Sequence, residues 1–211
     1  MGKIKSVREQ VYEHVLHMIR TDELKFGDKI NIAELQEQLG VSRPPINEAL
    51  IQLASDGILD NISRKGFFVK QMTDEKAANI YEVITALDIY VLEKVMQRAT
   101  EKDLDALRII ISKIDDAIAR EDFDEYYNLQ DNFHHTYLEM CGNPFMIEMM
   151  DDLRRQVIRT TVFSENTEKL FDYFRNSNKD HEEIVNRIER KDMNGISELI
   201  LEHNYRKLNN M

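Results

Sequence analysis

Residues 40–53 read GVSRPPINEALIQL and describe how one helix ends and the next begins. Gly40 can end a preceding helix, and Ser42 can cap the following one. Pro44 and Pro45 are tolerated there because the amides of a first helical turn have no partner within the helix. The apolar residues after them repeat at helical spacing, at Ile46, Ala49, Leu50 and Leu53. The stretch predicts two helices joined by a tight turn.

The flanking sequence extends this helix pair into a larger module. Before it, an apolar stripe predicts a helix that ends before Gly27, and the capping-box spacing at Asn31 predicts a short second helix. After it, two short apolar runs at 58–62 and 67–69 are separated by a loop that contains Gly66. Three helices followed by a β-hairpin are typical of a winged helix-turn-helix.

The remainder of the chain repeats its apolar residues with the period of helices. Its predicted helices include 145–163, 167–190 and 193–208. Three prolines and seven glycines in 211 residues are too few for many strands joined by tight turns. The sequence therefore predicts a mainly α protein: a winged helix-turn-helix over 1–72, then an all-α antiparallel bundle of about six helices over 73–211.

The charge is divided unevenly between the two predicted domains. The chain has 28 basic and 39 acidic residues, a net charge of −11. Residues 1–72 hold ten of each, so residues 73–211 hold 18 basic and 29 acidic residues and carry the whole excess (18 − 29 = −11). A neutral module can still bind a phosphate backbone where its basic residues share one face. The acidic total therefore does not exclude DNA.

The composition argues against a membrane protein and for the cytoplasm. No apolar run approaches the ~20 residues that a membrane-spanning helix needs, and the N-terminus has no apolar signal region. Cys141 is the only cysteine, so no disulfide can form within the chain. We expect a cytoplasmic protein with no membrane partner.

Polar and basic residues occur at the two places where a winged helix meets DNA. The first residues of the second helix of the pair enter the major groove, where Arg43 can reach guanine and Asn47 can bond adenine. The hairpin loop carries two more cations that suit the DNA backbone or the minor groove. The predicted DNA-binding residues are Ser42, Arg43, Pro44, Asn47, Arg64, Lys65 and Gly66.

Three histidines in the C-terminal part lie on the apolar faces of different predicted helices: His134, His181 and His203. A single histidine on such a face is more often a core residue than a ligand. Three that point into one bundle raise the case for a shared divalent metal, because neutral imidazoles suit zinc and similar ions, but their spacing alone leaves the core interpretation ahead.

The N-terminal motifs resemble the DNA-binding domain of GntR-family bacterial transcription regulators. The resemblance covers nearly all of residues 5–71 and rests on the segments Asp22–Gly27, Leu39–Leu50, Gly57–Leu59 and Gly66–Val69. Phe26 stands where the family usually has proline. Asn47 stands where it usually has an arginine that contacts DNA, so the family's usual operator is not implied for this chain.

The C-terminal part is similar to the FCD domain of the FadR subfamily, through Phe133-His134, the segment 142–144, His181 and His203. In many members one aspartate and three histidines bind a divalent metal, and a small carboxylate effector occupies its open positions. The resemblance implies His134, His181 and His203 as ligands.

The fourth ligand position departs from the family. Gln130 stands where the aspartate usually lies, four residues before His134. Asp131 and His135 offer the aspartate–histidine spacing in another register, but a shift of one residue turns a helix by about 100°, so both pairs cannot face the core. The apolar residues that share a helix face with His134 favour His134 over His135 as the ligand. Gln130 is then the candidate fourth ligand, and it is weaker than a carboxylate because its amide oxygen is uncharged.

Three arginines follow on the predicted helix 145–163: Arg154, Arg155 and Arg159. Several lie off that helix's apolar stripe, so we expect solvated surface residues rather than clamps for an effector.

The motifs predict a DNA-binding transcription regulator, and the family resemblance implies a repressor controlled by a small carboxylate at a histidine-lined, metal-containing pocket. We expect a homodimer, because a palindromic double-stranded operator needs two recognition helices. Two alternatives stay open. One is the same fold with metal-independent effector binding. The other is a metal-dependent hydrolase, against which the sequence offers no obvious general base near the histidines.

Overall fold

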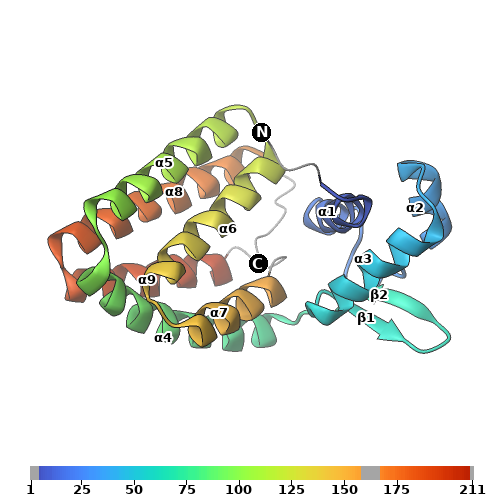
Figure 1. The fold of residues 1–211 in the computed structure, drawn as a ribbon, viewed down its shortest axis with the longest axis horizontal. Coiled ribbons are helices and arrows are strands. Elements are labelled where there is room, and N and C mark those ends of the chain that lie inside the picture. The colour runs from blue at the N-terminus through green and yellow to red at the C-terminus, as the bar shows by residue number, and fades with distance from the viewer. Residues whose placement is uncertain (1–4, 158–166, 210–211) are drawn as a thin grey trace. The chain divides into compact units, whose positions relative to one another are not determined.

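The computed structural model describes residues 5–157 and 167–209 (Figure 1). The chain divides into two compact units, Met1–Thr73 with Arg155–Arg159 and Asp74–Arg154 with Thr160–Met211. Most of the chain is helical, and the strands in the described residues form a single two-stranded sheet. The predicted fold class, a winged helix-turn-helix followed by a helical bundle, is confirmed.

The N-terminal unit contains three helices and an antiparallel hairpin. They are α1 (Val7–Arg20), α2 (Ile32–Leu39), α3 (Arg43–Ser55), β1 (Leu59–Ile62) and β2 (Gly66–Val69). The hairpin pairs Leu59 with Val69, and the same strand β2 forms an isolated bridge from Phe68 to Lys29. The apolar stripe predicted on α3 is fully buried at Ile46 and Leu50. This core fixes α3 against α1 and leaves the start of α3 exposed.

Local sequence explains how α2 and α3 are joined. The Asn31 side chain accepts hydrogen bonds from the amides of Ala33 and Glu34 and so caps α2. Gly40 has φ 63°, a left-handed conformation that glycine adopts without a steric cost. Ser42 takes the N-cap position of α3 but its side chain makes no capping hydrogen bond, contrary to the expected cap. The Ser42 side chain is exposed.

The C-terminal unit is a bundle of six helices in the described residues. They are α4 (Asp74–Arg98), α5 (Glu101–Ala119), α6 (Phe123–Met140), α7 (Pro144–Gln156), α8 (Thr167–Arg190) and α9 (Met193–Asn209). Helix α5 packs on α6 and α8, and α4 packs on α6 and α9 (Figure 1). The helix predicted over 145–163 ends at Gln156, and residues 158–163 lie outside the described residues. None of the described helices is both long and apolar enough to cross a membrane.

Candidate DNA-binding groove and metal centre

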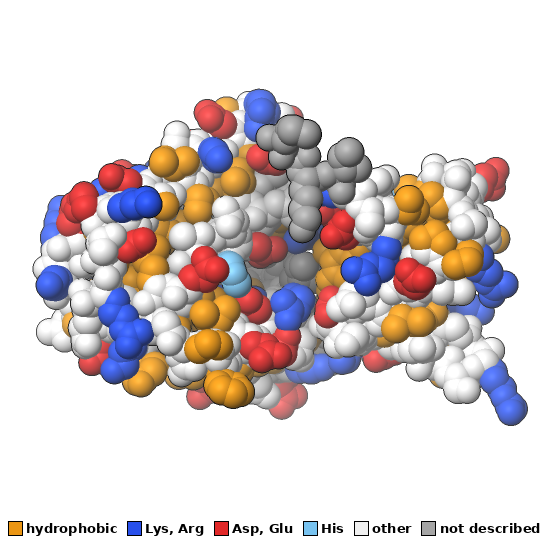
Figure 2. All heavy atoms as spheres, viewed as in Figure 1, with side chains coloured by type: hydrophobic (Ala, Val, Ile, Leu, Met, Phe, Trp, Pro, Cys, Tyr) orange, Lys and Arg blue, Asp and Glu red, His pale blue; other side chains and the backbone are white. Residues whose placement is uncertain are grey.

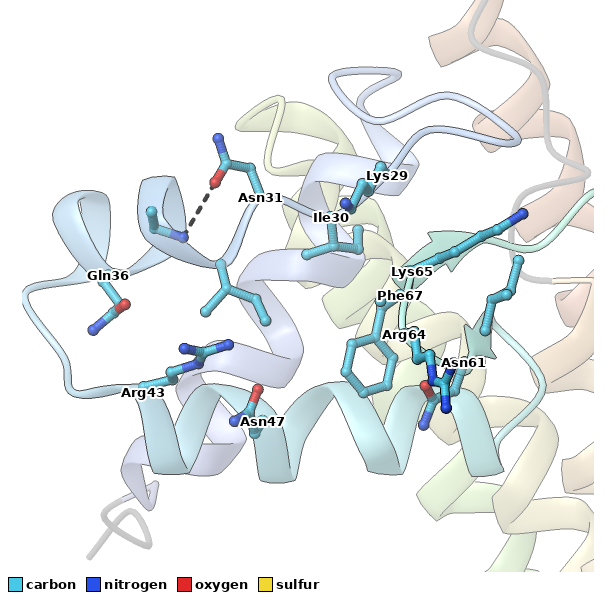
Figure 3. Close-up of a pocket in the computed structure, with 14 residues that line it drawn as sticks. Lys29, Ile30, Asn31, Gln36, Arg43, Asn47, Asn61, Arg64, Lys65 and Phe67 are labelled. Atoms are coloured by element: carbon cyan, nitrogen blue, oxygen red, sulfur yellow. Dashed lines mark hydrogen bonds between the residues drawn. The ribbon is translucent and has the colours of Figure 1, made fainter.

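A groove of about 860 Å³ lies between α2, the start of α3 and the hairpin. Four of its lining side chains are cationic, at Lys29, Arg43, Arg64 and Lys65, and none is acidic. Figure 3 shows Arg43 and Asn47 on α3 and the two hairpin cations on the opposite side of the groove. Lys and Arg side chains also project at the hairpin tip in Figure 2. In a chain of net charge −11, this surface is matched to a polyanion.

Five of the seven predicted DNA-binding residues line this groove: Arg43, Asn47, Arg64, Lys65 and Gly66. The other two, Ser42 and Pro44, are exposed at the beginning of α3 but are not part of the lining. The hairpin turn brings the wing residues into position through positive φ angles, 64° at Arg64 and 103° at Gly66. The structure therefore brings the recognition-helix and wing residues to one concave surface.

Sequence reasoning missed four polar residues of the groove: Lys29, Asn31, Gln36 and Asn61. Lys29 reaches the groove because its backbone pairs with Phe68, a pairing between residues 39 positions apart that local patterns cannot reveal. A Cβ atom added at Gly66 would lie 3.6 Å from Lys29 Cε, so the lysine stem passes beside the turn of the hairpin. Gln36 is on α2 and Asn61 on β1, so every wall of the groove carries a polar group.

The three predicted histidines converge in the interior of the C-terminal unit. His134 comes from α6, His181 from α8 and His203 from α9, and all three are buried. Their ligand atoms lie within 4.8 Å of one another. The ring of His181 also stacks on Phe133, with 4.3 Å between centroids, which fixes its plane.

Each imidazole uses its Nδ1 atom for a neighbouring side chain. The pairs are His134 with the Tyr137 hydroxyl (3.3 Å), His181 with Asn178 Oδ1 (3.3 Å) and His203 with Asp180 Oδ2 (2.8 Å). The three Nε2 atoms are also buried and are the remaining ring atoms that can bind a ligand. Metal-binding histidines are commonly oriented in this way, by an outer partner on the other nitrogen.

The partner of His134 belongs to a buried network across three helices. The Tyr137 hydroxyl donates to Asp88 Oδ1 at 2.6 Å and accepts from Arg154 Nη2 at 2.8 Å. Arg154 Nη2 also donates to both Asp88 oxygens at 2.7 Å. Because the tyrosine proton is directed to Asp88, the bond from His134 must be donated by Nδ1–H, which leaves a lone pair on Nε2. Burial raises the pKa of Tyr137, so the hydroxyl keeps its proton.

Arg154 is not the solvated surface residue that its sequence position predicts. Its side chain is 14% exposed and forms an ion pair with Asp88, whose side chain is 2% exposed. Burial alone would lower the pKa of Arg154, but the adjacent Asp88 carboxylate outweighs burial and raises it. Arg155 is half-buried, and Arg159 lies outside the described residues.

The two registers on α6 have different surroundings. Gln130 is buried one turn before His134, on the face that carries the cluster. Asp131 is exposed, and His135 is half-exposed with its Nδ1 3.0 Å from Asp151 on α7. His135 is therefore placed outside the cluster. Three buried imidazoles with oriented Nε2 atoms form a donor set that fits zinc or a similar divalent ion.

Together, a winged helix-turn-helix with a basic groove and a helical unit with a buried histidine cluster define the class of two-domain bacterial regulators. Residues 7–69 match the model of "Bacterial regulatory proteins, gntR family", and residues 79–206 match the FCD domain. The chain belongs to this family, as a member with an FCD domain. The family and its matched relatives are regulators and not enzymes.

Three similar proteins illustrate the relationship. The transcriptional regulator YdhC of Bacillus subtilis is 29% identical over 143 residues, 67% of this chain and 64% of that protein, so the match spans less than two thirds of YdhC. The transcriptional repressor RspR of Escherichia coli is 22% identical over 206 residues, 96% of this chain and 88% of that protein. The structure of E. coli McbR/YncC has a TM-score of 0.77 at 20% identity, covers 98% of this chain and 97% of that one, and shares the fold.

Proposed function

We propose that this chain is a sequence-specific DNA-binding repressor of the FadR subfamily, controlled by a small carboxylate at its buried histidine cluster. Residues 1–72 would bind double-stranded operator DNA, and residues 73–211 would bind the effector and form a homodimer. The observation that carries the proposal is the basic groove beside an exposed recognition helix, in a chain whose other domain is acidic. The name of the relative RspR supports repression.

The groove supports a division of labour among its residues. Arg43 and Asn47, at the start of α3, are placed for base edges, where arginine suits guanine and asparagine suits adenine. Arg64 and Lys65 on the wing are placed for phosphates. At Ser42, Pro44 and Gly66 the protein backbone would approach the DNA closely, and the Ser42 hydroxyl would bond a phosphate.

The histidine cluster supports the proposal that the C-terminal unit binds the effector. His134, His181 and His203 would hold a divalent ion through Nε2, with Gln130 as the fourth position. The ion, zinc or nickel, would supply open positions for an effector carboxylate. A homodimer would place two recognition helices on a palindromic operator.

The proposal is tested by selecting genomic fragments with the purified protein at low salt. We expect recovery of one or a few palindromic sites, and a change in affinity when zinc and a carboxylate mixture are added. Arg43→Ala should lose the selection while leaving the far-ultraviolet circular dichroism unchanged. Binding with equal affinity to all fragments would refute a sequence-specific regulator.

Lys29→Ala should weaken DNA binding to all sequences by a similar factor. Lys29 would neutralise a phosphate, and removing one such cation reduces the magnitude of the slope of log K against log salt by about 0.9. The slope is measured by fluorescence anisotropy between low and physiological salt. Lys25→Ala is the matched control, because Lys25 is exposed in the same unit and lies outside the groove. An unchanged slope for Lys29→Ala would exclude a phosphate interaction at this residue.

Tyr137→Phe should weaken zinc binding about 10–100-fold, the usual effect of losing an outer-shell partner. The phenyl ring keeps the packing but no longer accepts from His134 Nδ1. Zinc affinity is measured by competition with a chromophoric chelator, and the His134 tautomer by nitrogen-15 NMR. Tyr126→Phe is the control, a buried tyrosine that is not bonded to the cluster. If Tyr137→Phe binds zinc with wild-type affinity, Tyr137 does not contribute to metal binding.

A further inference from the structure

A pocket of about 510 Å³ lies between α4 and α9, two helices that pack side by side in the C-terminal unit (Figure 1). Small-molecule sites commonly measure about 300–1,000 Å³. The described residues that line this α4–α9 pocket include Ala78, Ala86 and Ile89 of α4 and Leu201, Asn204 and Tyr205 of α9. None of the three clustered histidines is among them. The pocket is therefore separate from the site proposed above.

The walls of the α4–α9 pocket are largely apolar. Ala78 and Ala86 lie about two turns apart on α4, and their methyl groups leave space that larger side chains would fill. On α9, Leu201 is 54% exposed and Tyr205 is 63% exposed. A ligand with a hydrocarbon body would remove this apolar surface from water, which favours binding.

One buried polar atom of the lining lacks a hydrogen-bond partner. Thr85 Oγ1 donates to the backbone carbonyl of Tyr81 at 2.7 Å, so it can only accept from Asn204 Nδ2, 3.0 Å away. This bond fixes which end of the Asn204 amide faces Thr85. The other end, Oδ1, is buried and has no partner in the described part of the chain. A buried acceptor without a donor is costly, so a ligand that brings a donor would relieve that cost.

The charge of the pocket selects among possible donors. Glu82 is exposed and is the one charged residue among the described residues that line it. Residues 73–211 also carry the whole negative excess of the chain. This field attracts a cation and repels an anion. The exposed ring of Tyr205 is a further surface on which a cation can lie.

We propose that the α4–α9 pocket binds a primary ammonium ion that carries an apolar body. An ammonium group has three donors and no lone pair, so it suits a site that offers acceptors and a negative charge. It would donate to Asn204 Oδ1 and be attracted by Glu82, while its hydrocarbon body would cover Leu201 and Tyr205. Such an amine would be a second effector, held by residues that the histidine cluster does not use.

The experiment measures the binding of 2-phenylethylamine to the full-length protein by isothermal titration calorimetry, with a chelator present so that no metal takes part. The amine is charged at neutral pH, as a lysine side chain is. Its analogues 2-phenylethanol and 3-phenylpropionate have the same ring with a neutral or a negative end. We expect the amine to bind about tenfold more tightly than the alcohol, the usual gain of a charged hydrogen bond. The acid should not bind.

Three variants locate the site, and a fourth is a matched control. Ala86→Phe fills the pocket from an exposed position and should abolish binding. Val83→Phe is the control, because Val83 is also exposed on α4 but does not line the pocket. Glu82→Gln should reduce the preference for the amine over the alcohol about two- to fivefold, the effect of an exposed ion pair. Asn204→Leu should remove most of the affinity, and circular dichroism checks that it folds.

Three outcomes would overturn the proposal. One is equal affinity for the amine, the alcohol and the acid. Another is amine binding that persists unchanged in Ala86→Phe, because the amine would then bind elsewhere. The third is no binding of any probe at millimolar concentration; if Ala86→Phe then also changes the sedimentation coefficient, a second copy of the chain covers the pocket. The measurement involves neither metal nor DNA, so its failure would leave the proposed function standing.

Discussion

Arg154→Met should lower the free energy of unfolding of the C-terminal unit by about 3–5 kcal/mol, the cost of breaking a buried ion pair at one partner. Methionine keeps much of the side-chain volume but leaves the Asp88 carboxylate buried beside the Tyr137 hydroxyl without its cation. The loss is measured by urea denaturation followed by circular dichroism. Arg175→Met is the control, because its ion pair with Asp172 is more than half exposed and should be worth at most about 1 kcal/mol.

A double variant tests whether the loss of stability comes from the Asp88 carboxylate that is left buried without Arg154. Asp88→Asn combined with Arg154→Met removes both charges and keeps a side chain that can bond Tyr137. Replacing both members of a buried pair is often neutral, so the double variant should be more stable than Arg154→Met alone. If the two single losses simply add, Asp88 and Arg154 are not coupled.

The fold was predictable because its signals are local. Gly40, the two prolines and the apolar stripe of α3 lie within 14 consecutive residues, and they place the turn and the second helix without long-range information. The bundle follows from uninterrupted helical periodicity. The end of α7 at Gln156 was not predicted, because the apolar stripe continues to Val157 and no glycine or proline follows until Gly195.

The candidate sites were predictable only in part, because some of their residues are brought together by contacts between distant parts of the sequence. Helical spacing put His134, His181 and His203 on buried faces, and the structure brings their rings together. The partners that orient them were not visible, because Asp88 and Tyr137 are 49 residues apart and Arg154 has the sequence context of a surface cation. Lys29 was missed in the groove because only the pairing with Phe68 places it beside the wing.

His181→Ala should abolish the stabilisation of the protein by zinc. A ligand that binds only the native state adds RT ln(1 + [L]/Kd), about 2.7 kcal/mol at a concentration of 100 Kd. His181 is the most enclosed of the three, fully buried and stacked on Phe133, and alanine has no atom that can replace its Nε2 as a ligand. The free energy of unfolding is measured by urea titration with chelator and with excess zinc, and the zinc-dependent difference is compared between variants.

His135→Ala is the matched control, because it removes an imidazole next to His134 in sequence but outside the cluster. His135 is half-exposed and bonds Asp151, so its loss should leave the zinc-dependent difference intact. The pair of variants separates the two registers on α6, since His134 is buried in the cluster and His135, turned about 100° from it, is half-exposed. A zinc effect that survives His181→Ala and disappears in His135→Ala would place the metal on the outer face of α6, with Asp131 and Asp151 as carboxylates that could supply ligands.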